Sequence, residues 1–302
     1  MPYVAFIALA LIWGVSFLFI KVGVRDMSPT ALVLVRSVSG TVALAAIMLA
    51  MRRPLFGRHW RSRVIPFGVM AITNALVPWV AIAWGEEHIS SGLASILNST
   101  ATLWTAILIF WVIPSERPSP VNYAGVLIGI TGVAILVLRD LTSHGVTFSF
   151  LGVMACLGAA FSYGVAAIYA RRKLRGMNVY EQSLGQLVAT SLIAIPFAAP
   201  SVPHIHLAFV SMGAVIALGA VQTGIAYLLY YYTMNTLGAV RATGVTLLVP
   251  VTAVFWGVVL LGESLSVPII AGMAVILAGI VLTNVGRASR SEPAVERDSA
   301  AA

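Results

Sequence analysis

A series of polar side chains stands at helical spacing between residues 91 and 105. Ser91, Ser95, Asn98, Thr102 and Thr105 follow one another at steps of four, three, four and three, which places all five on one face of a helix. Such a face can hydrogen-bond water or a polar ligand. The alternative is close packing between helices, for which small polar residues are also suited. We favour a cavity, because Asn98 is larger than such packing prefers.

Two amides form a second group of candidates. Asn74 and Gln222 lie within apolar stretches, and a buried amide needs partners and offers both a donor and an acceptor. Pro78 follows Asn74 by about one helical turn, with Trp79 beside it. A proline inside a helix leaves a carbonyl that a neighbour or a water-filled cavity must satisfy, although a simple kink explains Pro78 equally well. We therefore predict that Asn74 and Gln222 contact a substrate.

Aromatic side chains and one arginine complete the set. Trp13 and Phe17 are one turn apart, and Tyr163 and Tyr227 lie in later apolar stretches. Each is suited to ordinary packing, but together they also suit a flat or partly apolar ligand, whose ammonium they can hold by cation–π attraction. Arg36 is the one basic residue well inside an apolar stretch. It is expected either to extend outward to water or to bind a carboxylate.

The absence of several catalytic and proton-transfer patterns narrows the range of functions that the sequence supports. Every aspartate and glutamate is expected at the end of an apolar stretch, in a loop or in the tail, so a carboxylate proton relay inside the membrane is not supported. The five histidines fall in expected loops, away from any serine nucleophile in an apolar stretch. A single cysteine, Cys156, forms neither an intrachain disulfide nor a thiolate metal cluster. An intramembrane enzyme is the less favoured class, and no metal or cofactor is expected.

The elements that must position these residues are membrane helices. The chain has 302 residues, of which 60% are hydrophobic and 9% charged, and its mean hydropathy is +0.97. A globular domain carries roughly a quarter charged residues, so the solvent of this chain is mostly lipid. Apolar stretches long enough to cross a membrane predict ten helices. They lie at 3–21, 29–51, 64–84, 91–113, 120–138, 148–170, 179–199, 207–232, 239–261 and 267–286.

Basic residues set the expected topology. The net charge of +8 is explained without nucleic acid, because the arginines and lysines concentrate in alternate loops. An N-terminus in the cytoplasm leaves only Lys21, Arg25 and Arg139 on the opposite side. We expect both termini in the cytoplasm and residues 287–302 to form a disordered cytoplasmic tail.

The chain repeats itself at an offset of about 147 residues. Each half holds five predicted helices, and an odd number inserts the second half upside down relative to the first. Inverted repeats are typical of secondary transporters, whose halves exchange inward-open and outward-open states around a central site. The aligned pairs include Thr105 with Thr252, Glu116 with Glu263, Ser119 with Ser266, Gly125 with Gly272, Gly132 with Gly279 and, at an offset of 150, Gly14 with Gly164.

These features together resemble a known family. The ten helices, Trp13-Gly14, Arg36 and the repeated glutamate-serine-glycine pattern at the end of each half are similar to the EamA type of the drug/metabolite transporter superfamily, over residues 3–286. The overall likeness is greatest to bacterial amino-acid exporters of the YddG kind. The resemblance implies a basket of helices around a central cavity, with the fifth and tenth helices at the periphery. It also implies efflux linked to a proton or other gradient in some members.

The expected protein is thus an all-α integral membrane carrier with ten transmembrane helices. The first inverted repeat covers residues 1–147 and the second 148–286. We expect it to export amino acids, aromatic and other neutral ones included, through the inner membrane by alternating access, as a monomer or weak homodimer and without strong proton coupling. A broader drug or nucleoside efflux carrier is the alternative. Glu116 and Glu263 are expected to cap the helices that follow them. The predicted cavity residues are Trp13, Phe17, Asn74, Pro78, Trp79, Ser95, Asn98, Ser99, Thr102, Tyr163, Gln222, Tyr227 and Thr246, with Arg36 as a structural or carboxylate-binding residue.

Overall fold

The computed structural model describes residues 2–57, 60–112, 119–144, 147–174, 177–204, 208–222, 226–237 and 245–288. Glu116, the side chain of Tyr227 and residues 289–302 of the predicted tail lie outside the described part. Within that part, every regular element is a helix. In chain order these are α1 (Pro2–Gly23), α2 (Pro29–Ala50), the 3₁₀ turn η1 (Trp60–Arg63), α3 (Val64–Ala71), the π-helical turn η2 (Ile72–Leu76), α4 (Val77–His88), α5 (Ser91–Ser99), α6 (Ala101–Val112), α7 (Pro120–His144), α8 (Phe148–Lys173), α9 (Val179–Ala198), the 3₁₀ turn η4 (Ala199–His204), α10 (Phe209–Ala220), α11 (Ala226–Leu237), α13 (Val245–Leu261) and α14 (Val267–Ala288).

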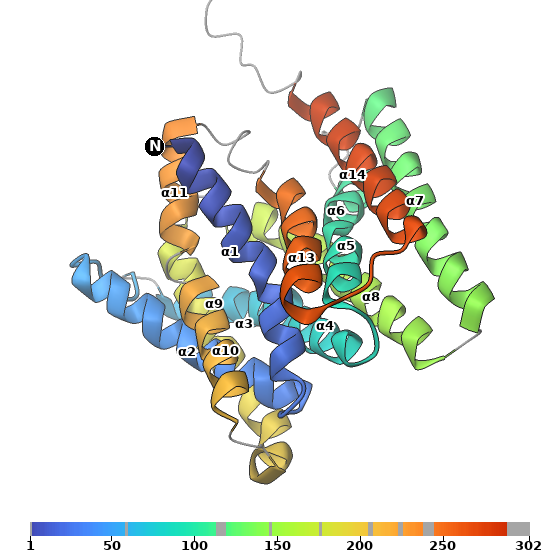
Figure 1. The fold of residues 1–302 in the computed structure, drawn as a ribbon. Coiled ribbons are helices and arrows are strands. Elements are labelled where there is room, and N and C mark those ends of the chain that lie inside the picture. The colour runs from blue at the N-terminus through green and yellow to red at the C-terminus, as the bar shows by residue number, and fades with distance from the viewer. Residues whose placement is uncertain are drawn as a thin grey trace, which may run out of the picture.

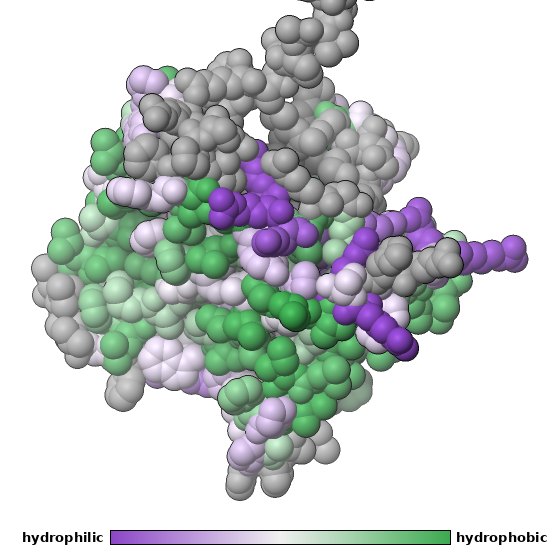
Figure 2. Space-filling view, turned by 180° about the vertical axis from the view of Figure 1, so that it is seen from behind, coloured by the Kyte–Doolittle hydropathy of each residue, from purple (hydrophilic) through white to green (hydrophobic). Residues whose placement is uncertain are grey.

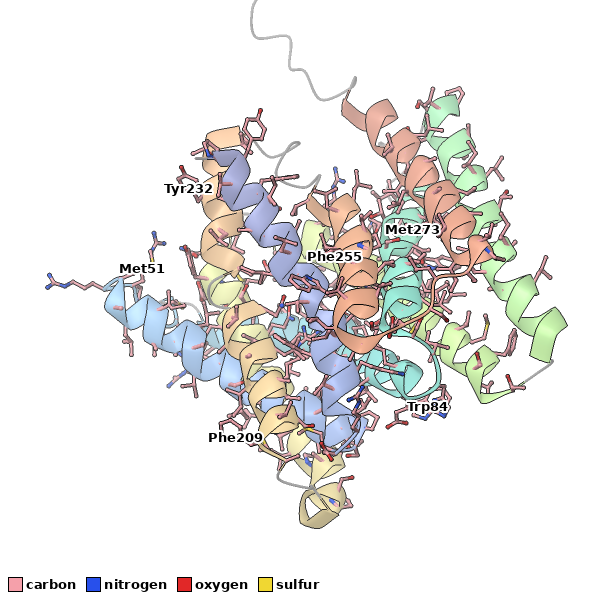
Figure 3. The ribbon with its side chains drawn as sticks, in the orientation of Figure 1. Met51, Trp84, Phe209, Tyr232, Phe255 and Met273 are labelled. Carbon is pink, nitrogen blue, oxygen red and sulfur yellow. The ribbon has the colours of Figure 1, made fainter. Side chains whose placement is uncertain are left out.

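Length and composition make this a membrane fold. Seven helical segments among the described residues are long and apolar enough to cross a bilayer, and they coincide with the first seven predicted helices. The last two predictions correspond to the shorter apolar helices Val245–Leu261 and Val267–Thr283. The eighth, 207–232, covers Phe209–Ala220 and the first part of Ala226–Leu237, with residues 223–225 between them outside the described part. Large apolar side chains face outward: Phe209 is 92% exposed, and Figure 3 shows Phe209 and Tyr232 pointing away from the bundle. In Figure 2 apolar residues cover broad areas of the molecule, as a surface in contact with lipid requires.

The third predicted helix is longer than 64–84 and is not uniform. It runs without interruption from Trp60 to His88 through the π-helical turn η2. Pro78, which lacks an N–H and crowds the preceding turn, follows two residues after η2, and a π turn is one way to relieve that crowding. The hydroxyl of Ser162 donates to the carbonyl of Thr73 within η2 (2.7 Å) and so satisfies one of the displaced carbonyls.

The fourth predicted helix is broken into α5 and α6 at Thr100. The hydroxyls of Ser99 and Thr100 donate to the carbonyls of Ile96 and Leu97, each at 2.6 Å. Hydroxyl groups that bond back to the preceding turn bend helices. The main-chain N–H of Thr100 also bonds Leu97 three residues back (3.1 Å), which tightens the chain at the break.

Helices of the two halves interleave in the bundle (Figure 1). α1 packs against α10, α11 and α13, α8 packs against α4 and α6, and α2 packs against α9 and α10. α7 and α14 form a separate pair, at the right of Figure 1. The N-terminus and the end of α14 lie on the same side of the bundle, which fits an even number of crossings.

Glycines explain the close approach of α7 and α14. A Cβ added at Gly125 would lie 2.5 Å from the main-chain nitrogen of Thr283, and one added at Gly279 would lie 2.5 Å from that of Gly129. Only glycine allows backbones to approach this closely. The repeated glycines of the sequence are thus the residues through which the last helix of each half meets the other.

Candidate functional site

A cavity of about 490 Å³ lies within the bundle. Its volume falls within the roughly 300–1,000 Å³ of typical small-molecule sites. Side chains from both halves line it, and polar and apolar groups alternate around the wall. The lining residues are Trp13, Ser16, Phe17, Ile20, Arg36, Asn74, Trp79, Ile82, Ser95, Asn98, Ser99, Ala101, Thr102, Tyr163, Ser183, Gln186, Leu187, Gln222, Thr246, Leu247, Val249, Pro250 and Ile280.

One wall is the break between α5 and α6. Ser95, Ser99 and Thr102 line the cavity on either side of Thr100, together with Asn98. Among the described residues, the Ser95 hydroxyl and the Asn98 carbonyl oxygen are buried and have no hydrogen-bond partner. Buried polar atoms are normally satisfied, so two unsatisfied atoms on a cavity wall are available to water or a ligand. Interrupted helices also form the binding sites of many transporters.

A pair of amides joins two elements at the cavity. Asn74 Nδ2, on the π-helical turn η2, donates to Gln186 Oε1 on α9 (3.0 Å). Gln186 is 8% exposed, and Ser183 lies one turn before it on the same wall. The bond fixes the orientation of both amides, which leaves the Asn74 carbonyl and the Gln186 N–H groups with capacity for a further partner.

Arg36 carries the positive charge of the cavity. Its guanidinium lies over the ring of Trp79, with Cζ 3.8 Å from the ring centroid. This stacking holds the side chain against the cavity wall, whereas extension outward to water was one of the two expectations for this residue. Arg36 is also the only charged side chain among the described lining residues. The site therefore attracts a negatively charged group.

A further part of the wall comes from α1, Gln222 and α13. Trp13 packs against Tyr230 with ring centroids 5.7 Å apart. Gln222 Nε2 donates to the main-chain carbonyl of Ile12, so this amide ties the second half to α1 while lining the cavity. Thr246 and Pro250 of α13 complete this side.

Most of the residues singled out from the sequence lie on this cavity. Ser91 and Thr105, the two ends of the polar face, lie outside the lining. Pro78 also lies outside it and is buried in α4, so the kink interpretation describes its position. Tyr227 falls outside the described side chains. Substrate contact stays a prediction for all the others, namely Trp13, Phe17, Asn74, Trp79, Ser95, Asn98, Ser99, Thr102, Tyr163, Gln222, Thr246 and Arg36.

Three polar lining residues were not predicted. Ser16 and Ser183 are single hydroxyls in apolar helices and gave no periodic signal. Gln186 did have a signal in the sequence, because it aligns with Arg36 when the two halves are compared at an offset of 150 residues. The alignment of Gln186 with Arg36 is thus the signal that could have identified Gln186.

Two glutamates differ from their expected surroundings. Glu263 does not cap α14, the helix that follows it; its carboxylate accepts from the N–H groups of Ser91 (2.7 Å) and Gly92 (3.2 Å) at the start of α5. Glu86 lies in the last turn of α4, as expected for a residue at the end of an apolar stretch, but its side chain has no exposed surface. Its position at a helix end therefore does not place this carboxylate in water.

Comparison with known proteins agrees with this architecture. The model of the EamA-like transporter family matches the chain twice, over residues 1–138 and 150–285. A protein of Salmonella typhimurium (strain LT2) named "Probable amino-acid metabolite efflux pump" is 29% identical over 288 residues, covering 91% of this chain and 92% of its own. A protein of Streptantibioticus cattleyicolor named "Probable terminal-alkyne amino-acid exporter" is 27% identical over 276 residues, covering 90% of this chain and 89% of its own. A solved crystal structure with 18% sequence identity matches with a TM-score of 0.65, over 94% of this chain and 97% of its own, which is a likeness of fold.

Proposed function

Because the chain belongs to the EamA-like transporter family, we propose that it exports amino acids, aromatic and other neutral ones included, from the cytoplasm by alternating access. It is a multi-pass membrane transporter and not an enzyme. The observation that carries the substrate proposal is the cavity, in which one guanidinium stands among aromatic and neutral hydrogen-bonding side chains.

Each part of an amino acid has a matching wall. The carboxylate pairs with Arg36, since guanidinium and carboxylate groups form short, charge-assisted hydrogen bonds. The ammonium finds neutral acceptors in the Asn74 and Asn98 carbonyls and the face of an aromatic ring. An apolar side chain packs against Phe17, which is 5% exposed. The names of the two relatives support the same substrate class.

Alternating access rests on two inverted halves, and matched contacts support that arrangement. A Cβ added at Gly14 of α1 would lie 2.1 Å from the Thr252 hydroxyl of α13, and one added at Gly164 of α8 would lie 3.2 Å from the main-chain nitrogen of Thr105 in α6. Gly14 aligns with Gly164 and Thr105 with Thr252, so one contact is the other with the halves exchanged. A two-fold relation between halves requires such exchanged pairs.

The proposed setting is the inner membrane, with both termini in the cytoplasm. The arginines and lysines of alternate connections support this orientation. In Figure 2 hydrophilic residues gather at the right edge, where α2 ends and this orientation expects cytoplasm. The helix pair α7 and α14 takes the peripheral place, in contact with lipid.

The proposal is tested by counterflow. Proteoliposomes are loaded with one unlabelled amino acid and the uptake of the same labelled amino acid is followed, at equal pH on both sides, over all twenty amino acids. We expect uptake of several neutral ones with phenylalanine among them, and no uptake in protein-free liposomes. Absence of counterflow for every amino acid refutes the substrate class. Nucleosides and cationic dyes are included because the aromatic lining also suits a broader efflux carrier, and their uptake without amino-acid uptake would favour that alternative.

A further inference from the structure

Glu86 is a fully buried carboxyl group in the last turn of α4. None of its side chain is exposed, and among the described residues neither carboxyl oxygen has a hydrogen-bond partner. An ionised carboxylate without partners is strongly disfavoured in such surroundings, because its solvation is lost and nothing replaces it. The arrangement therefore suits the neutral, proton-bearing form of the group.

The nearest cation does not relieve that cost by bonding the carboxyl group. The ammonium of Lys21 donates to the main-chain carbonyls of Glu86 and Ile89, the latter at 2.8 Å. It thus satisfies the carbonyls at the end of α4, where a cation is favoured. Lys21 still acts on the carboxyl group electrostatically, but its hydrogen bonds go to the backbone.

Charged and titratable groups from four other elements interact electrostatically with Glu86. Lys21 comes from α1, Arg36 from α2 and Cys156 from α8, while Glu263 comes from the connection between α13 and α14. Glu263 is a like charge and is held by the N-terminal amides of α5. The electrostatic surroundings of the carboxyl group therefore depend on how helices from both halves lie relative to one another.

Glu86 is not itself a lining residue of the cavity, but Ile82, one turn earlier on α4, lines it, and so does Ile20, which directly precedes Lys21. The groups around Glu86 gather at the end of the bundle where α1 and α4 end, α5 begins and the connection between α13 and α14 contacts α5. Opening of this end changes the surroundings of Glu86 directly, while substrate in the cavity is one helical turn away.

We propose that Glu86 is the proton-carrying group of the transport cycle and exchanges one proton for each amino acid exported. When its end of the bundle opens, the carboxylate takes up a proton from the outer solution and an O–H bond forms. When that end closes and the cavity faces the cytoplasm, the bond breaks and the proton leaves through the cavity. The proton enters as the zwitterionic amino acid leaves, so the atoms balance and each cycle carries one positive charge into the cytoplasm. This inference rests on the proposed function and replaces the expectation of export without strong proton coupling.

The test uses reconstituted full-length protein and the amino acids that show counterflow at equal pH. The membrane potential is held at zero with valinomycin and equal potassium concentrations on both sides. A pH difference of one unit, with the more acidic solution on the side opposite the labelled substrate, then drives about tenfold accumulation of the label on the acidic side if one proton is exchanged per molecule, because at equilibrium the substrate ratio equals the proton ratio. Wild-type protein is expected to reach this accumulation. Glu86→Gln is expected to keep counterflow and to show no accumulation. Glu87→Gln, which removes the adjacent and exposed carboxylate, is the matched control and is expected to behave as wild type.

The outcomes separate this inference from the proposed function. Counterflow without accumulation in the wild type refutes proton exchange but leaves amino-acid transport standing. Accumulation that persists in Glu86→Gln refutes the role of Glu86. If the buried amide prevents recovery of Glu86→Gln, Glu86→Met gives an apolar replacement of similar length with the same expected result. Glu86→Asp, which keeps a carboxyl group, is expected to restore accumulation.

Discussion

Removal of the Arg36 guanidinium is the sharpest test of how the cavity recognises substrate. Arg36 is the only charged side chain among the described lining residues, and its Cζ lies 3.8 Å from the centroid of the Trp79 ring. Arg36→Met keeps an unbranched apolar stem against that ring and removes the charge. The variant therefore isolates the interaction with an anionic group of the substrate.

The size of the effect follows from the interaction that is lost. A hydrogen bond to a charged group contributes about 1.5–3 kcal/mol, and each 1.4 kcal/mol is roughly tenfold in affinity. Arg36→Met should therefore weaken phenylalanine binding by about tenfold to a hundredfold. Phenethylamine has the same ring and ammonium but no carboxylate, so its affinity should change by less than about twofold. Arg36→Lys keeps the charge without the planar fork and should fall between wild type and Arg36→Met.

The assay is equilibrium binding of both ligands to purified protein in detergent, which does not depend on turnover. Arg25→Met is the control, because Arg25 is exposed at the connection between α1 and α2 and lies outside the cavity lining. Equal weakening of phenylalanine and phenethylamine by Arg36→Met would show that the arginine supports packing. No change for either ligand would show that the carboxylate binds elsewhere. Either result refutes the proposed placement of the substrate.

Three further perturbations test other parts of the structure. Gly125→Ala brings a Cβ to 2.5 Å from the Thr283 nitrogen and should lower stability by about 1–3 kcal/mol through overpacking, seen as a lower thermal unfolding midpoint; Gly158→Ala, with no atom within 4 Å of the added Cβ, should not lower it. Glu263→Gln weakens the bonds to the Ser91 and Gly92 amides and should cost about 1.5–3 kcal/mol in the same measurement, and an unchanged midpoint would contradict the cap. Asn74→Ala and Trp79→Ala should change the order of preference among amino acids in counterflow at wild-type membrane abundance, whereas reduced abundance would assign these residues to packing.

The sequence predicted the helices well because the hydrophobic pattern is a local property. A run of apolar residues near 20 in number has few structural alternatives in a bilayer, so all ten stretches correspond to described helices or parts of them. The break at Thr100 was missed because hydroxyls that bond back to their own helix leave composition unchanged. The end of α4 at His88 was missed because two glutamates lowered the local hydropathy.

The candidate site likewise has features that depend on local sequence, which were predicted, and features that depend on contacts between distant helices, which were not. Spacing along one predicted helix placed five polar residues on a common face, and the structure has Ser95, Asn98 and Thr102 on the cavity but not Ser91 or Thr105. Hydrogen bonds between helices far apart in the chain could not be predicted, since nothing in the local sequence links Asn74 to Gln186 or Glu263 to Ser91. Burial of Glu86 was beyond reach for the same reason: it depends on which helices enclose the end of α4.

The repeated glutamate shows how an accurate sequence pattern can be given the wrong local role. Glu263 was found because it aligns with Glu116, and a carboxylate just before a helix suggests a cap on that helix. In the folded chain Glu263 instead caps α5, so a residue of the second half holds the start of a broken helix in the first. That helix carries Ser95 and Asn98 to the cavity, and its cap, Glu263, interacts electrostatically with the buried Glu86. A motion that separates the halves at this end must break the cap, move the cavity wall and change the surroundings of Glu86 together, which is the physical link that coupled exchange requires.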